Sequence, residues 1–127
     1  MYLLGLDIGT SSIKASIVES GSGKCSASCY SPASEMEILS PKPGWAEQDP
    51  DLWWKHSVIA IQAAIQNAGI NAFEIKAIGI SYQMHGLVCV DKEMKVLRNS
   101  IIWCDSRAVE IGNSAFREIG DEKCLSH

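Results

Sequence analysis

The sequence has little positive charge, no long apolar run and no basic leader. It contains 11 Lys and Arg against 15 Asp and Glu, which gives a formal net charge of -4. Nucleic-acid binding needs clustered basic residues, so this balance argues against nucleic acid as a partner. No apolar run approaches the roughly 20 residues of a membrane span. The N-terminus also lacks a basic segment followed by an apolar one, so we expect a cytoplasmic protein without a membrane partner.

Paired cysteines are also missing. The five cysteines form an odd set without a C-x-x-C pair, which argues against both a disulfide framework and a thiolate zinc site. We expect most of them to lie in the core as inert residues. The composition, 46% hydrophobic and 20% charged over 127 residues, is typical of one globular domain.

The first part of the chain predicts three β-strands, at residues 2–8, 13–19 and 24–31. Residues 2–8 form a nearly continuous apolar run, which is typical of a strand buried on both faces. Residues 13–19 alternate between apolar and polar, the period of a half-buried strand. A glycine-rich turn at 21–23 follows, so the three strands should form an antiparallel meander.

A loop at 32–48 and a helix at 50–68 should follow, with Asp49 as N-cap, Pro50 in the first turn and Gly69 as C-terminal cap. The helix should pack its apolar stripe, Trp54, Val58, Ile61, Ile65 and Ala68, on the sheet. Short strands at 76–82, 87–91 and 101–103 and a helix at 106–119 complete the pattern. The apolar face of this last helix is Ala108, Ile111, Ala115 and Ile119.

This order predicts an α/β fold in which a helix joins the meander to a parallel fourth strand. Ligands in open sheets bind outside the carboxyl ends of the strands. Here those ends are near Asp7, Gln83 to Gly86 and Trp103 to Arg107.

A candidate phosphate site directly follows the first strand. Asp7 ends the strand, and Gly9, Thr10, Ser11 and Ser12 form the turn after it. Gly9 permits a backbone that points N–H groups at an anion, and the hydroxyls add donors. Lys14 supplies positive charge, and Asp7 could hold Mg²⁺ through water. The alternative is a plain hairpin turn that Asp7 caps.

Four ordered blocks of the chain resemble the N-terminal part of the FGGY family of carbohydrate kinases. The blocks are Leu6-Asp7-Ile8-Gly9-Thr10-Ser11-Ser12-Ile13-Lys14; Gly44-Trp45-Ala46-Glu47-Gln48-Asp49-Pro50 with Trp53-Trp54; Gly79-Ile80-Ser81 with Gln83-Met84-His85-Gly86; and Leu97-Arg98 with Ile101-Ile102-Trp103-Cys104-Asp105-Ser106-Arg107. The resemblance implies a ribonuclease H-like fold of the actin and hexokinase superfamily, with ATP and Mg²⁺ as cofactors. It also implies that residues 1–127 are part of an N-terminal domain. The catalytic Asp, a second phosphate loop and the adenosine pocket belong to a later part of such kinases, so no catalytic base is expected here. A homodimer is possible for the full-length protein.

Within the family, Gln83-Met84-His85-Gly86 is most similar to the xylulokinases, which implies that Met84 and His85 contact the sugar. Met84 offers an apolar wall for the carbon face, and His85 can hydrogen-bond a hydroxyl, as can Gln83. Without the resemblance, His85 would be interpreted as a structural histidine at a strand end.

The resemblance also suggests that the block with Asp105 and Arg107 closes one wall of the sugar cleft. The alternative is a helix N-cap with a solvated or ion-paired arginine. For Trp45, Trp53 and Trp54 we expect ordinary packing between helix and loop.

Phosphorylation of D-xylulose to D-xylulose 5-phosphate by ATP is therefore the expected reaction of the full-length protein, and the fragment alone should be inactive. Gluconate or another polyol is the alternative acceptor. A non-catalytic sugar- or nucleotide-binding fragment is an alternative of another class. A ribonuclease H-like nuclease is a further alternative, but the fourth predicted strand ends without a carboxylate.

Overall fold

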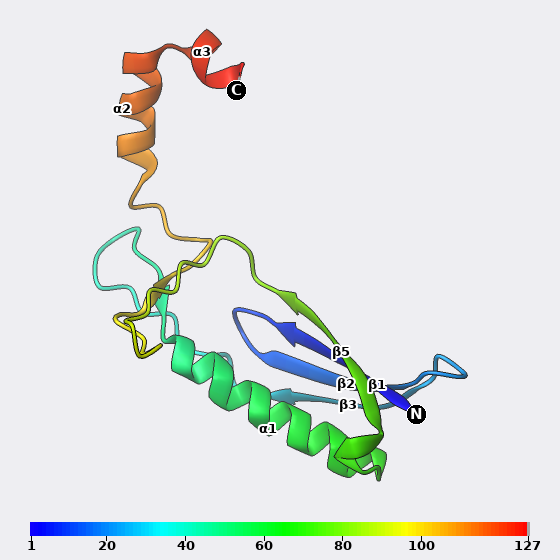
Figure 1. The fold of residues 1–127 in the computed structure, drawn as a ribbon. Coiled ribbons are helices and arrows are strands. Elements are labelled where there is room, and N and C mark those ends of the chain that lie inside the picture. Colours follow the sequence, from blue (N-terminus) through cyan, green and yellow to red (C-terminus); the bar gives the residue numbers. More distant parts are fainter. Residues whose placement is uncertain (127) are drawn as a thin grey trace.

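The computed structural model describes residues 1–126. A four-stranded sheet carries one long helix on one face, and a small two-stranded ribbon lies beyond one end of that helix (Figure 1). Two further helices, α2 and α3, extend away from the sheet at the C-terminal end of the chain. Among the described residues, no helix is both long enough and apolar enough to span a membrane.

The main sheet has the order β3-β2-β1-β5. Strands β1 (Tyr2–Ile8), β2 (Ile13–Glu19) and β3 (Cys25–Ser31) are antiparallel neighbours, and β5 (Ile75–Tyr82) runs parallel to β1. The predicted meander and the parallel fourth strand are thus confirmed. Because β1 and β5 are parallel, their carboxyl ends meet at the same edge of the sheet.

Helix α1 (Pro50–Ala68) connects the meander to β5 through the short 3-10 helix η1 (Ala72–Glu74). Its predicted ends are confirmed, because the Asp49 carboxylate accepts from the Asp51 N–H and Gly69 has a φ of 64°. The left-handed backbone at Gly69 avoids the steric cost that a Cβ would bring there.

The core lies between α1 and one face of β1 and β2. It consists of Leu4, Leu6, Ile13, Ala15, Ile17, Met36, Ala60 and Ala64. The predicted stripe is confirmed in part, because Ile61, Ile65 and Ala68 pack against the core. The most buried positions lie one residue earlier, at Ser57, Ala60 and Ala64. Trp54 is 74% exposed, whereas Trp53 packs against the core. The small side chains of Ala60 and Ala64 allow the helix to approach the sheet closely. The prediction relied mainly on large apolar residues and therefore did not include these two alanines.

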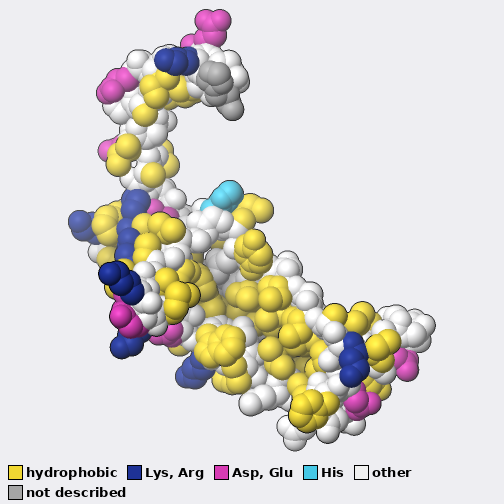
Figure 2. Space-filling view, viewed as in Figure 1, with side chains coloured by type: hydrophobic (Ala, Val, Ile, Leu, Met, Phe, Trp, Pro, Cys, Tyr) yellow, Lys and Arg dark blue, Asp and Glu magenta, His cyan; other side chains and the backbone are white. Residues whose placement is uncertain are grey.

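Strand β1 is not buried on both faces, as its apolar run had predicted. Leu4 and Leu6 are buried under α1, but Leu3, Gly5 and Asp7 are exposed on the other face. Strand β5 is also uncovered, and hydrophobic side chains gather on the surface between β5 and α1 (Figure 2). A groove there is lined by Leu4, Ile61, Ile65, Ala72, Ile75, Lys76, Ala77 and Ile78.

The polar segment 32–48 is not wholly a loop. Its end forms β4 (Glu47–Gln48), which pairs antiparallel with β6 (Ser100–Ile101). Strand β6 begins one residue before the predicted strand 101–103 and is shorter. Both strands of this ribbon are well buried, which places the side chains of 47, 48 and 100 inside the protein.

The predicted strand at 87–91 is wrong. Within residues 1–126, this segment makes only isolated bridges, between Leu87 and Ile101 and between Val90 and Val96. The backbone on either side is not extended: His85 has a φ of 64°, and the Asp91 carboxylate accepts from the N–H groups of 93 and 95. These local turns compete with a strand ladder, so alternation of apolar residues was not sufficient.

The C-terminal helices are α2 (Val109–Ile119) and α3 (Asp121–Leu125). Helix α2 starts three residues later than the predicted helix 106–119, because Asp105 and Ser106 bond to other segments. Its predicted apolar face is uncovered by the described chain, with Ile111 73% and Ile119 53% exposed. Amphipathic sequence therefore predicted the helix but not its packing.

The cysteines are not core residues, which corrects the expectation from composition. All five are free thiols; Cys25 and Cys104 are exposed, and the other three are half-buried.

Candidate functional site

The candidate site lies where the carboxyl ends of β1 and β5 meet. Residues 9–12 form the turn between β1 and β2, and Gln83 follows β5. The Gln83 N–H donates to the Ile8 carbonyl at 2.9 Å, which extends the parallel pairing to the edge of the sheet. The two segments that the sequence singled out for phosphate and for sugar are therefore neighbours.

The turn after β1 presents unused backbone donors. The Gly9 N–H donates to the Ser12 carbonyl at 3.2 Å, but the N–H groups of Thr10, Ser11 and Ser12 donate to no protein acceptor within the described part of the chain. Consecutive free N–H groups of this kind suit an anion. Gly9 itself has no positive φ; a Cβ there would lie 2.9 Å from the Ser12 carbonyl oxygen, so the turn needs glycine for space.

Asp7 and Lys14 lie opposite one another in the β1–β2 register, on the face of the sheet away from α1. Both are exposed, and they line an open depression with Gly5, Leu6, Ser16, Gly79, Ile80 and Ser81. The Asp7 carboxylate makes no ion pair with any described residue. A free carboxylate on an open surface fits Mg²⁺ that keeps most of its water and also binds phosphate. No group of three His, Cys, Asp or Glu that could enclose a metal occurs in residues 1–126.

Thr10 connects the turn to the segment after β5. Its hydroxyl donates to Gln83 Oε1 at 3.0 Å and accepts from Trp103 Nε1 at 2.9 Å. The only hydrogen of this hydroxyl is thereby used. Thr10 can serve a phosphate through its backbone N–H, and its hydroxyl instead orients Gln83.

Gln83 and His85 line a hollow of ≈ 240 Å³ together with Ile8, Trp53, Tyr82, Gly86 and Val88. This volume is below the usual size of a complete ligand pocket, so these residues form one wall of a site. His85 has a φ of 64°, an uncommon conformation for a residue with a Cβ that is often found at functional positions. Met84 is 64% exposed.

The predicted site residues do not share one cavity. Asp7 and Lys14 line the depression on the open sheet face, Gln83 and His85 line the second hollow, and Ser11 and Ser12 line a third with Tyr30 and residues 32–35. The hydrogen bond between Thr10 and Gln83 joins the first segment to the second.

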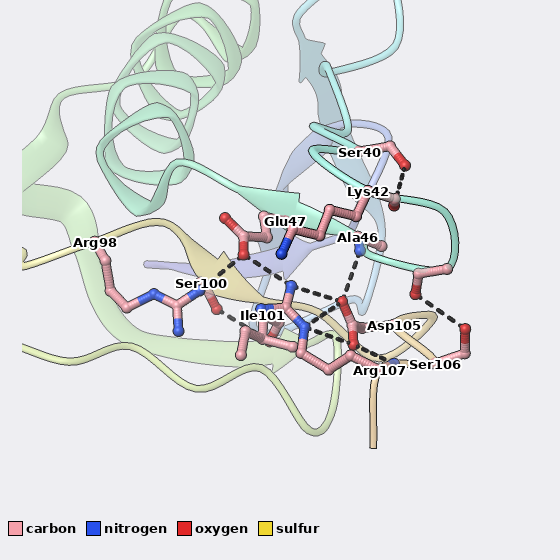
Figure 3. Close-up of polar contacts among 11 residues, drawn as sticks. Ser40, Lys42, Ala46, Glu47, Arg98, Ser100, Ile101, Asp105, Ser106 and Arg107 are labelled. Carbon is pink, nitrogen blue, oxygen red and sulfur yellow. Dashed lines mark hydrogen bonds and ion pairs between the residues drawn. The ribbon is translucent and has the colours of Figure 1, made fainter. Parts of the chain in front are cut away.

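Asp105 and Arg107 are engaged with each other and with the β4 ribbon (Figure 3). Asp105 accepts from the Ala46 N–H at 2.7 Å and from Arg107 Nε at 2.9 Å. Arg107 Nη2 lies 2.7 Å from Glu47 Oε1, which also accepts from Arg98 Nη2 at 2.8 Å. These bonds tie residues 46–47 to residues 98–107.

The same contacts shift the ionisation of the pair. The side-chain hydrogen bond from Arg107 lowers the pKa of Asp105 well below its ordinary range, although partial burial opposes this shift. The hydrogen bond to Asp105 in turn raises the pKa of Arg107. The guanidinium also stacks on Trp45, with its central carbon 3.7 Å from the ring centre. No described hydrogen bond of either residue reaches 7–14 or 83–86, so the geometry favours an ion-paired arginine. The expected N-cap role of Asp105 is wrong, because the cap position of α2 is Ala108, without a side-chain hydrogen bond.

Two residues that hydrogen-bond to Thr10, Trp103 and Gln48, were not assigned as site residues from the sequence. Trp103 was noted only as lying near a strand end, and Gln48 only as part of a block. No local sequence signal indicated their contact with Thr10, because 93 and 38 residues separate them from it.

The three tryptophans that were expected to pack between helix and loop differ in burial. Trp45 and Trp53 are half-buried, and Trp54 is exposed.

The order β3-β2-β1-β5, with a parallel strand reached through a helix, defines a mixed α/β fold of the actin and hexokinase kind. Residues 2–126 match the model of the FGGY family of carbohydrate kinases, N-terminal domain. The chain therefore belongs to this family. This membership favours a carbohydrate kinase over the nuclease alternative.

Individual relatives differ in the substrate that their names state. The chain is 35% identical to the xylulose kinase of Bacillus subtilis over 84% of this chain and 20% of that protein. It is 33% identical to glycerol kinase 5 of Gallus gallus over 94% of this chain and 22% of that protein. The crystal structure of a "xyloylose kinase" from Brucella ovis superimposes with a TM-score of 0.78 and 37% identity, covering 94% of this chain and 25% of that one. The chain thus spans about a fifth of the length of its curated relatives.

Proposed function

We propose that the chain is the N-terminal part of an ATP-dependent kinase that converts D-xylulose to D-xylulose 5-phosphate. The observation that carries this proposal is the hydrogen bond from Thr10 Oγ1 to Gln83 Oε1. It places the end of the candidate phosphate turn beside the candidate sugar segment, which is the arrangement that phosphoryl transfer needs. Family membership supports the reaction class.

The turn after β1, Lys14 and Asp7 form the phosphate and metal side of the proposed site. The free N–H groups of the turn and the Lys14 ammonium would hold phosphate oxygens of ATP, and Asp7 would hold Mg²⁺. Bound Mg²⁺ offsets negative charge on the phosphates. No residue of this chain is assigned as the base that receives the hydroxyl proton. That group belongs to a later part of the proposed kinase, so this chain alone should not turn over substrate.

The sugar is held by Gln83, Met84 and His85. Met84 is exposed at the edge of the sheet and offers an apolar contact for the carbon face. His85, fixed by its left-handed backbone, hydrogen-bonds a hydroxyl. Asp105 and Arg107, proposed as a further wall of the cleft, fix β4 through their bonds to Ala46 and Glu47.

Location and assembly are proposals of the same kind. We infer a cytoplasmic enzyme, since the sugar and ATP of the proposed reaction are soluble small molecules. Homodimerisation of the full-length protein remains a prediction.

The test is an ADP-release assay on the full-length protein with D-xylulose, gluconate and glycerol. D-xylulose should give the highest kcat/KM. Met84→Ala and His85→Ala should each raise the KM for D-xylulose about tenfold, the effect of one lost contact of about 1.4 kcal/mol. Met94→Ala is the matched control, because Met94 is also exposed and has a φ of 63°.

The other outcomes distinguish the alternatives. Preferential turnover of glycerol would favour a glycerol kinase, the activity in the name of the Gallus gallus relative. Preferential turnover of gluconate would favour a gluconate kinase. Sugar binding without ADP release would indicate a non-catalytic module. No ADP release with any of the three acceptors would refute the substrate assignment.

A further inference from the structure

Gln48 lies behind the candidate phosphate turn and is 2% exposed. Its side-chain amide makes four hydrogen bonds to four different segments. Nε2 donates to the carbonyls of Thr10 at 2.8 Å and Glu37 at 3.4 Å. Oε1 accepts from Trp53 Nε1 at 3.2 Å and from Gln83 Nε2 at 3.4 Å. A primary amide has two donors and two acceptor positions, so every hydrogen-bonding position of Gln48 is used.

The chemistry of the partners fixes the orientation of this amide. A tryptophan indole can only donate, so the atom that faces Trp53 must be the oxygen. A backbone carbonyl can only accept, so the atom that faces Thr10 must be the nitrogen. At neutral pH, only glutamine supplies both functions at this length. Glutamate would place a carboxylate oxygen against the Thr10 carbonyl, two acceptors without a hydrogen between them.

The bond to the Thr10 carbonyl has a consequence on the opposite side of the turn. The carbonyl of Thr10 and the N–H of Ser11 belong to one planar trans peptide and point in opposite directions. Gln48 holds the carbonyl from inside the protein, so it aims the free Ser11 N–H outward. The next peptide is held in the same way, because the Met36 N–H donates to the Ser11 carbonyl at 2.8 Å.

The network also closes on itself. Thr10 donates through its hydroxyl to Gln83, Gln83 donates to Gln48, and Gln48 donates to the Thr10 carbonyl. Three residues from the turn, from β4 and from the end of β5 therefore form a ring of hydrogen bonds. The 3.4 Å bond between Gln83 and Gln48 is its weakest link.

We propose that Gln48 is a positioning residue that aims the Ser11 N–H at the transferred phosphate and couples the phosphate turn to the sugar segment at Gln83. This proposal rests on the proposed kinase function. Gln48 contacts neither substrate and acts only through Thr10 and Gln83. Its loss should therefore lower kcat more than it raises the KM for the sugar.

The test compares Gln48→Glu and Gln48→Met with the exposed control Gln62→Glu. In the full-length protein, both changes at 48 should lower kcat about 100-fold, the order of effect expected when one preorganised donor is misdirected. The KM for D-xylulose should change less than about threefold in the same variants. Gln62→Glu should leave both constants unchanged, since Gln62 lies on the exposed side of α1.

The pH dependence separates positioning from general loss of stability. A protonated glutamate can donate to the Thr10 carbonyl, whereas the carboxylate cannot. The ratio of the turnover of Gln48→Glu to that of the unaltered protein should therefore rise as the pH is lowered, while the ratio for Gln48→Met should stay flat. The proposal would be overturned if the turnover ratio did not change with pH for either variant and kcat per folded molecule stayed near that of Gln62→Glu.

A second measurement does not depend on enzyme activity. In the ¹⁵N-labelled chain, Gln48→Met and Gln48→Glu should shift the NMR signals of the Trp53 indole N–H and the Ser11 backbone N–H, and Gln62→Glu should shift neither. If the Ser11 signal shifts but the full-length protein phosphorylates no acceptor, the positioning role of Gln48 is supported and the proposed function is refuted. If Trp53 moves and Ser11 does not, the positioning itself is refuted. Unfolding of both variants would also overturn it, because Gln48 would then be a structural residue.

Discussion

Replacing Gly9 by alanine should displace the candidate phosphate turn. An alanine Cβ would lie 2.9 Å from the Ser12 carbonyl oxygen, whereas ordinary van der Waals contact begins at 3.4 Å. The turn must open by the difference, about 0.5 Å. Opening it also weakens the hydrogen bond from the Gly9 N–H to the same carbonyl, now 3.2 Å long. Gly9 lacks a positive φ, so in the folded state the effect is steric and involves no backbone strain of the left-handed kind.

The magnitude follows from two opposing terms. Forcing extra atoms into a packed site costs about 1–3 kcal/mol. Alanine restricts the unfolded chain more than glycine does, which returns about 0.4–1 kcal/mol. The variant should therefore be less stable by about 1 kcal/mol. A displacement of 1 Å can lower turnover about 100-fold, so half of that should lower kcat about tenfold.

Two measurements check this reasoning, with Gly21→Ala as the matched control. Gly21 lies in the turn at the opposite end of β2 and has no positive φ, and a Cβ added there would meet nothing within 4 Å. Urea unfolding followed by tryptophan fluorescence gives the stability, and ADP release by the full-length protein gives kcat. If Gly9→Ala matches Gly21→Ala in both measurements, the turn is not sterically closed as described.

Three further changes probe the β4 ribbon, and urea unfolding measures each. Gly44→Ala should cost about 1–2 kcal/mol, because Gly44 has a φ of 79° and a Cβ would lie 2.6 Å from Ser106 Oγ; a smaller loss than Gly9→Ala would contradict this. Glu47→Gln should cost about 2–3 kcal/mol, since it removes the buried charge that pairs with Arg107 while the more exposed second arginine softens the loss. The lowered pKa of Asp105 means that the unfolded chain binds this proton more tightly than the folded chain. The stabilisation should thus be fully present above pH of about 5 and be lost as the pH falls below about 4, and Asp105→Asn should remove that part of the acid dependence.

Local sequence signals predicted the elements well wherever the signal and the structure depend on the same few residues. The cap residues Asp49 and Gly69 placed both ends of α1 because capping is a contact within one turn. The meander strands followed from the apolar run at 2–8, the period-two alternation at 13–19 and the short turns between them. Local signals failed at 87–91, where the left-handed backbone at His85 and the turn at Asp91 interrupt pairing that the apolar pattern favoured.

The candidate site was predicted as a set of segments, and their mutual contacts were not. Asp7, the turn 9–12 and the segment 83–86 were placed together by the rule that parallel strands end at one edge. The sequence could not assign the hydroxyl of Thr10 to Gln83, nor Asp105 and Arg107 to each other and to Glu47. These bonds depend on side-chain directions across segments that are far apart in the chain.

By itself, the sequence determined the meander, the crossover helix, the parallel strand and the resemblance to FGGY kinases, since all of these depend on spacing and residue type along the chain. The tertiary structure decided which face of α1 is buried, which strand faces remain open, and that Gln48 joins the candidate phosphate turn to Gln83. The physical reason is that a hydrogen-bond network between distant segments depends on how the backbone brings them within about 3 Å. A linear pattern of residues does not contain that distance.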